Sequence, residues 1–120
     1  MLADRDLASL GDAYINFAYS LALSNKAGRP LGVKVKGSML AQALRNAGLR
    51  GYLSSRMTKH ALADAVEALI VYAWLCNVIT LEETVRIITE AQEPVEGLTK
   101  LLVAASRKIT FSWRLFRIPC

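Results

Sequence analysis

Two long apolar runs set the pattern of hydrophobic and polar positions along this chain. In residues 60–77, HALADAVEALIVYAWLCN, Ala, Leu, Val and Ile fill most positions and no turn residue interrupts them. This pattern predicts a helix that is buried on most of its circumference. A second run, residues 7–24, predicts another helix that begins near Asp4 or Asp6 and ends near Asn25. Its expected buried side chains are Leu7, Leu10, Tyr14, Ala18 and Leu21.

Shorter elements are predicted between and after these runs. Gly and Pro in residues 26–32 end the first helix, and residues 33–36, VKVK, form an extended basic loop for which no pairing partner is apparent. Ser38 is a candidate N-cap for a helix that ends near Asn46. Residues 52–58 form a short helix or a turn.

The last third of the chain predicts two more helices. Thr80 caps an amphipathic helix over residues 81–91, and Pro94 begins a final helix. The expected buried face of that final helix consists of Leu98, Leu101, Leu102 and Ala105. The pattern as a whole predicts one all-α domain over residues 1–120, a length that leaves little room for a second module.

Two acids interrupt the most apolar run. Asp64 and Glu67 lie three residues apart and therefore share one helix face, next to positions that are expected to be buried. A buried carboxylate needs a proton, a cationic partner or a metal, because an unpaired ion in an apolar interior costs several kcal/mol. The alternative is that the pair marks the solvated stripe of an amphipathic helix.

A third acid lies in the first helix. The tetrapeptide LGDA at residues 10–13 has the same form as LADA at residues 62–65. If the helices cross at the small residues Gly11 and Ala63, Asp12 approaches Asp64 and Glu67. Three converging carboxylates repel one another unless a hard cation such as Mg²⁺ or Mn²⁺ lies among them, and such a cation can activate water for phosphodiester hydrolysis.

These two segments, LGDA at 10–13 and LADAVEALI at 62–70, resemble the two signature helices of the ribonuclease III catalytic domain. The second match is the more specific, since D-x-x-E-A-L inside an apolar helix is uncommon. The resemblance implies a ribonuclease III-like helical domain, a homodimer, and Mg²⁺-dependent cleavage of double-stranded RNA. It also implies that Asp12, Asp64 and Glu67 are the catalytic, metal-binding carboxylates.

The sequence departs from that family in its first helix. The family commonly has a Glu four residues before the first Asp, and often another seven before, but here these positions are Ala8 and Arg5. The mini-ribonuclease III class, which has no separate double-stranded-RNA-binding domain, is similar in lacking that Glu. The chain therefore looks closest to mini-ribonuclease III or to the short archaeal ribonuclease III-like proteins.

Charge is distributed unevenly along the chain. The 51 residues from Ala13 to Ala63 contain no acid and eight Lys or Arg residues. A basic surface beside an acidic metal site suits a polyanionic substrate, whereas the alternative is a set of dispersed, solvated cations. The predicted RNA-binding residues are Lys34, Lys36, Arg45, Arg50, Arg56 and Lys59.

Composition and the remaining motifs refine this picture. The 53% share of hydrophobic residues is high for a soluble monomer and favours a subunit interface. The longest uncharged run, residues 68–81, is shorter than the roughly 20 residues that a membrane span needs, so we expect a soluble, cytoplasmic protein. Cys76 and the terminal Cys120 are expected to be free thiols, and the alternative for Cys120 is a cross-link between two chains.

Two motifs have open interpretations. His60 lies four residues before Asp64. It is either a catalytic base or a capping or charge-balancing residue, and the second role is the more common one for a single histidine. The basic and aromatic tail, residues 108–120, contains Phe111, Trp113 and Phe116. These aromatic residues either stack on nucleic acid or pack against the dimer.

Three functional hypotheses follow from the sequence. The leading one is a homodimeric, Mg²⁺- or Mn²⁺-dependent endoribonuclease that acts on double-stranded or structured RNA. The second is an inactive RNA-binding or scaffold protein on the same fold, because position 8 is Ala. The third is a helical scaffold in which the three acids are structural.

Overall fold

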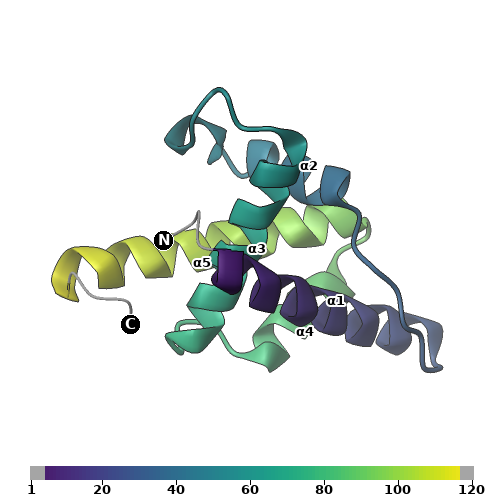
Figure 1. Cartoon of the computed structure of the whole chain (residues 1–120). Helices are drawn as coiled ribbons and strands as arrows, with labels where there is room; N and C mark the ends of the chain where they lie inside the picture. Colours follow the sequence, from purple (N-terminus) through teal and green to yellow (C-terminus); the bar gives the residue numbers. More distant parts are fainter. Residues whose placement is uncertain (1–4, 117–120) are drawn as a thin grey trace.

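In the computed structural model, which describes the backbone of residues 5–116 and the side chains of residues 5–108, the chain is all-helical (Figure 1). No strand occurs in this part of the chain, as the pattern predicts. The helices are α1 (Arg5–Ala27), α2 (Gly37–Asn46), α3 (Lys59–Leu75), α4 (Leu81–Glu90) and α5 (Pro94–Phe116), with a 3₁₀ turn, η1 (Arg50–Tyr52), before α3.

Helix α3 forms the centre of the fold, and α1, α2 and α5 pack around it (Figure 1). Eleven of its 17 residues are buried, which confirms the prediction from the apolar run. The helix begins at Lys59 and is capped by Thr58, whose Oγ1 accepts a 3.1 Å hydrogen bond from the backbone N–H of Ala61 and so satisfies a free donor of the first turn. It ends before Asn77, which adopts a left-handed φ of 57°.

Helix α1 packs on α3 with a face made of small and aromatic residues. Tyr14 and Ala18 are buried as predicted, and the Tyr14 hydroxyl shares a 3.0 Å hydrogen bond with Thr84 Oγ1 of α4. The prediction for Leu10 is wrong, because 45% of this side chain is exposed. The helix turns the face of Gly11 and Ile15 toward the core, and this rotation leaves Leu10 at the surface.

The segment between α1 and α2 is extended, as predicted, but it has a partner. Its backbone forms hydrogen bonds with the side chains of Ser20 and Ser24 on α1. The prediction that Ser38 caps α2 is wrong, because the helix begins at Gly37 and its N-cap, two residues before Ser38, is Lys36, which makes no side-chain cap.

The C-terminal helices match the sequence pattern closely. Thr80 and Glu83 form a reciprocal capping box at the start of α4, and Pro94 begins α5. All four predicted core residues of α5, namely Leu98, Leu101, Leu102 and Ala105, are fully buried. The aromatic residues Phe111, Trp113 and Phe116 lie outside the residues whose side chains are described.

The structure also bears on the expectations about Cys76 and about membrane-spanning segments. Cys76 is disulfide-bonded, so the expectation of a free thiol there is wrong. Among the described residues, none of the helices combines the length and apolarity needed to cross a membrane.

Candidate metal and RNA site

The crossing of α1 and α3 is unusually close because of Gly11. A Cβ atom placed on Gly11 would overlap the backbone carbonyl of Glu67 and lie 3.0 Å from its Cα atom. Only glycine permits this approach, since any other side chain would push the two backbones apart. The sequence predicted a crossing at Gly11 and Ala63, but Gly11 meets α3 one turn later. Ala63 instead lies beside Gly37 at the start of α2.

This crossing brings two of the three predicted carboxylates together. Glu67 is only 7% exposed, and its carboxyl group forms a hydrogen bond with that of Asp12. Burial, the hydrogen bond to Asp12 and the negative charges of Asp12 and Asp64 raise the pKa of Glu67 to about 8. In the absence of a cation, Glu67 is therefore protonated at neutral pH, and its O–H group donates the hydrogen bond to the Asp12 carboxylate.

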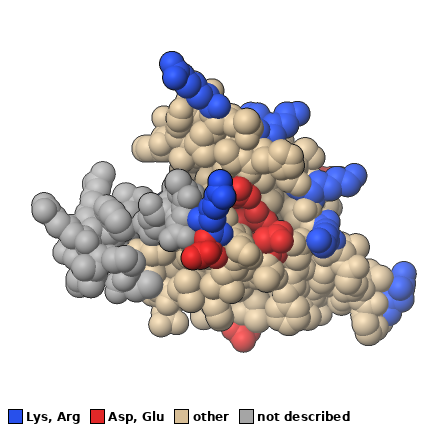
Figure 2. Space-filling view, in the orientation of Figure 1, with Lys and Arg blue, Asp and Glu red and all other residues tan. Residues whose placement is uncertain are grey.

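Asp64 lies at the edge of this pair. Its side chain is exposed, and it reaches Glu67 through its charge rather than through a hydrogen bond. Asp12 is also exposed, so the site has one buried carboxyl group and two at the surface. Figure 2 shows acidic side chains near the middle of this face, over the region where α1 crosses α3.

Asn16 holds Asp12 in place from one helical turn away. Its Nδ2 atom donates to Asp12 Oδ1 at 2.9 Å and to the Asp12 backbone carbonyl at 2.8 Å. Its Oδ1 atom accepts a 2.7 Å hydrogen bond from the backbone N–H of Val35. The acidic pair is thus connected through Asn16 to the extended basic segment that precedes α2.

The carboxylates suit a hard divalent cation in donor chemistry, since Mg²⁺ and Mn²⁺ prefer carboxylate oxygens. A cation would also replace the proton that joins Glu67 to Asp12 and offset the repulsion that raises the pKa of Glu67. Within residues 5–108, however, no three His, Cys, Asp or Glu side chains are gathered tightly enough to hold a metal ion. The residues therefore provide a ready pair, Asp12 and Glu67, and a third carboxylate nearby.

The predicted RNA-binding cations all lie in the segment from the end of α1 to the first residue of α3. Five of the six side chains are exposed, whereas Arg50 is half-buried and donates a 3.3 Å hydrogen bond to the Leu53 carbonyl. The ion pairs seen among the described side chains involve Arg86, Lys100 and Lys108, so none of the six is neutralised by a carboxylate. Figure 2 shows Lys and Arg side chains above and to the right of the central acidic patch, and one directly beside it.

Two positions that the sequence singled out remain outside the carboxylate pair. Ala8 is buried on the face of α1 that also contains Gly11, one turn before Asp12. His60 is exposed in the first turn of α3 and does not cap this helix, because Thr58 does.

Sequence reasoning missed the polar residues that connect the site to its surroundings. Asn16, Ser20 and Ser24 recur at four-residue spacing within a mostly apolar helix, and this regular polar stripe is the signal that could have identified them. It also missed Tyr52, which is 84% exposed and lies near Arg50 and Arg56 in the sequence.

This fold and this acidic crossing define an all-helical protein with a carboxylate site between two signature helices. A family model described as ribonuclease III matches residues 5–110. The chain therefore belongs to the ribonuclease III family. No curated protein matches it.

Proposed function

We propose that this chain is a divalent-metal-dependent endoribonuclease that cleaves double-stranded or structured RNA. One observation carries the proposal. In a chain of the ribonuclease III family, the close crossing at Gly11 joins the Asp12 carboxylate to the buried carboxyl group of Glu67. Ionisation of the buried Glu67 carboxyl group beside the exposed Asp12 carboxylate costs free energy, and a bound cation would offset that cost.

Asp12, Asp64 and Glu67 are the residues that would hold Mg²⁺ or Mn²⁺. Such a cation supplies Lewis-acid polarisation of a phosphate and lowers the pKa of bound water. The chain itself supplies the rest. Asn16 fixes the direction of the Asp12 carboxylate, burial keeps water away from Glu67, and Asp64 extends the negative charge to the surface.

The unpaired cations provide the RNA-binding surface of this proposal. Lys34, Lys36, Arg45, Arg56 and Lys59 are exposed, and Lys59 lies on the same helix as Asp64 and Glu67. Phosphate contacts of this kind hold a duplex without reading its sequence, so we expect recognition by shape and by phosphate and 2′-hydroxyl contacts. Binding should therefore weaken steeply with salt.

The proposal includes a homodimer. Leu10 and Phe17 of α1 are 45% and 56% exposed, and they lie seven residues apart on one stripe of the helix. Large apolar side chains grouped this way at a surface are typical of a subunit contact. Sedimentation of the wild type and of Phe17→Glu tests this. A dimer that becomes a monomer in the variant supports the proposal, and a wild-type monomer at micromolar concentration contradicts it.

Within the family, we place the chain nearest to the mini-ribonuclease III class and the short archaeal ribonuclease III-like proteins. The supporting observation is Ala8, a small buried residue at the position where the longer enzymes of the family commonly have Glu.

A cleavage assay tests the proposed activity. Labelled double-stranded RNA is incubated with the wild type in Mg²⁺, in Mn²⁺ or in EDTA, alongside Glu67→Gln. Glu96→Gln is the matched control, because Glu96 is a partly exposed acid on α5 that pairs with Lys100 at 3.0 Å. We expect metal-dependent cutting that falls by about 100-fold or more in Glu67→Gln and is unchanged in the control.

Ala8 also favours a second candidate function, an RNA-binding protein that has lost its chemistry. Position 8 lies one turn before Asp12 on the buried face, and it offers no ligand to a cation. Absence of cutting by the wild type in both metals, together with salt-sensitive RNA binding, would support this candidate. Cleavage that is gained in Ala8→Glu would then show that the site lacks one carboxylate.

A further inference from the structure

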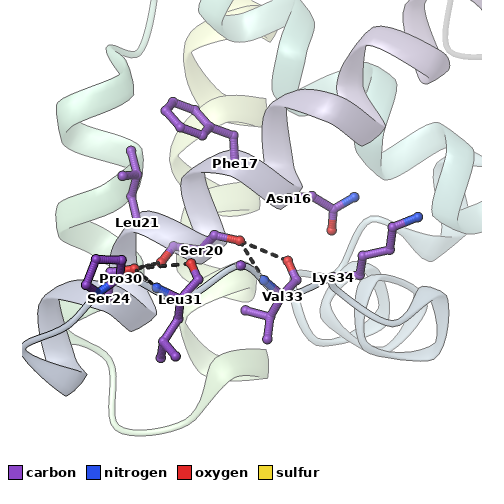
Figure 3. Close-up of a pocket in the computed structure, with 10 residues that line it drawn as sticks. Asn16, Phe17, Ser20, Leu21, Ser24, Pro30, Leu31, Val33 and Lys34 are labelled. Carbon is purple, nitrogen blue, oxygen red and sulfur yellow. Dashed lines mark hydrogen bonds between the residues drawn. The ribbon is translucent and has the colours of Figure 1, made fainter.

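A ladder of side-chain hydrogen bonds fastens the extended segment of residues 30–36, which we call the strap, along α1. Ser24 Oγ accepts from Leu31 N at 2.9 Å, and Ser20 Oγ accepts from Val33 N at 3.0 Å. The Ser20 hydroxyl also donates to the Val33 carbonyl of the strap at 2.9 Å. The single proton of the Ser24 hydroxyl is shared between the Ser20 carbonyl at 2.7 Å and the Leu31 carbonyl of the strap at 3.2 Å. Figure 3 shows these bonds as dashed lines, with Asn16 further along α1.

The spacing of the ladder follows from backbone geometry. Four residues of an α-helix rise about 6 Å, and two residues of an extended chain span about 6.6 Å. Polar residues at 16, 20 and 24 therefore match residues 35, 33 and 31 of a chain that runs in the opposite direction. In an extended chain, alternate residues turn their N–H groups to the same side, so each rung meets a backbone donor.

Asn16 differs from the two serines because it bonds to the acidic site as well as to the strap. Its Oδ1 atom is occupied by the N–H of Val35, so the amide must turn its Nδ2 atom toward Asp12. In this orientation, Asn16 donates to Asp12 Oδ1 and leaves the Oδ2 atom without a bond from the amide. Asn16 is half-buried, and its two partners lie on different segments.

We propose that Asn16 is a positioning residue that couples the strap to the carboxylate of Asp12, an inference that rests on the proposed nuclease function. Lys34 and Lys36 flank Val35 in the strap, and both are exposed. When these lysines bind phosphates, the bond from Val35 to Asn16 holds the amide in place, and the amide holds Asp12. RNA contact and the orientation of the carboxylate are thereby linked through one side chain.

Two substitutions separate the two bonds of Asn16. Asn16→Ser gives position 16 the same hydroxyl that Ser20 and Ser24 use, so it keeps a rung for Val35 but is too short to reach the Asp12 carboxylate. Ser20→Ala is the matched control, because it removes a rung of the strap and leaves Asn16 and Asp12 untouched. Mn²⁺ affinity is measured without RNA, and kcat and KM are measured for cleavage of double-stranded RNA.

We expect Asn16→Ser to weaken Mn²⁺ binding about 10-fold, to lower kcat about 10-fold and to leave KM unchanged. Losses of this size are usual when a metal-binding side chain loses its hydrogen-bond partner. Ser20→Ala should raise KM a few-fold and leave Mn²⁺ affinity at the wild-type value. Hydrogen exchange of the Val35 N–H should stay slow in Asn16→Ser and become faster in Asn16→Ala.

Three results would overturn the inference. If the wild type binds Mn²⁺ and cleaves RNA, and Asn16→Ser does both equally well, Asn16 has no positioning role although the proposed function stands. If Asn16→Ser and Ser20→Ala change kcat, KM and Mn²⁺ affinity alike, the ladder is only structural. If the wild type neither binds Mn²⁺ nor cleaves RNA, the proposed function fails and this inference fails with it.

Discussion

Two glycines in this molecule bring pairs of helices close together, but only one of the crossings contains charge. At Gly97, α5 approaches α4 so closely that a Cβ atom would lie 3.1 Å from Ile88 Cα and 3.2 Å from Ala91 Cβ. The neighbouring side chains Ile88, Ala91 and Leu98 are at most 3% exposed, and all are apolar. At Gly11, the approach of α1 to α3 is closer still, and it joins the carboxyl groups of Asp12 and Glu67.

The difference shows which feature belongs to the fold and which to the site. Close packing through glycine is a general way to fit two helices together, and the apolar crossing at Gly97 needs nothing more. The buried Glu67 carboxyl group, which meets the exposed Asp12 at the crossing of Gly11, opposes folding whenever it ionises without a cation. The acids are therefore best explained by a ligand, which supports the proposed metal site.

The largest expected effect is that of Gly11→Ala. The added methyl group would overlap the Glu67 backbone, which cannot move as a flexible side chain can. We expect a loss of at least about 3 kcal/mol in the free energy of unfolding, measured by urea titration. Whatever folded protein remains should lack cleavage activity, because Asp12 and Glu67 are pushed apart. A variant with wild-type stability would show that the crossing is not as close as described.

The next effect is the dependence of stability on pH, which arises at the crossing of Gly11 because Glu67 titrates there, and not at the apolar crossing of Gly97. The pKa of the Glu67 carboxyl group is 4.5 in the unfolded chain and is raised to about 8 in the folded protein. Between these values the folded state binds more protons, so its stability falls as pH rises, by about 2–4 kcal/mol in EDTA. Thermal melts of the wild type and Glu67→Gln from pH 5 to pH 8.5 measure this. The slope should be much smaller in the variant, and equal slopes would contradict the assignment.

Gly97→Ala should have a smaller effect. The contacts at 3.1–3.2 Å require shifts of a few tenths of an ångström, and the gain in helix propensity from Gly to Ala offsets part of that strain. We expect a net loss of about 1 kcal/mol in the free energy of unfolding, with Mn²⁺ affinity and RNA cleavage unchanged. A loss of Mn²⁺ binding in this variant would mean that the acidic site depends on the packing of α4 against α5.

Gly51→Ala gives the baseline for these comparisons. A Cβ atom at this position meets nothing within 4 Å, and its backbone is not left-handed. The free energy of unfolding should therefore change by no more than about 0.5 kcal/mol in the same urea titration. A larger change would show that replacing glycine disturbs this fold even where there is space for a side chain.

Much of the fold was predictable because its helices carry strong local signals. The uninterrupted apolar run predicted the buried α3, and Thr80 and Pro94 marked the beginnings of α4 and α5 correctly. Leu10 and Ser38 were predicted wrongly for a common reason. The rotation of a helix about its axis and the exact residue at which it begins depend on what it packs against, and the sequence of the helix alone does not contain that information.

The candidate site was predictable in its residues but not in its connections. The small residue before Asp12 indicated a close crossing, yet the partner residue, Glu67 rather than Ala63, depends on how far one helix slides along the other. The structure was needed to assign roles to Asn16, Ser20 and Ser24, because their side chains bond to the backbone of the strap. Every residue type except proline supplies the same backbone groups, so the sequence of the strap does not indicate these bonds.

The most direct test of the central claim is a calorimetric titration of the metal-free protein with Mn²⁺ at pH 7, repeated in buffers of different ionisation enthalpy. Wild-type protein should bind Mn²⁺ and release a proton, because Glu67 is protonated at this pH before the cation enters. Glu67→Gln should bind far more weakly and release none, whereas Glu96→Gln should behave as the wild type does. Equal Mn²⁺ affinity and proton release in the wild type and Glu67→Gln would contradict a metal site at the crossing of α1 and α3.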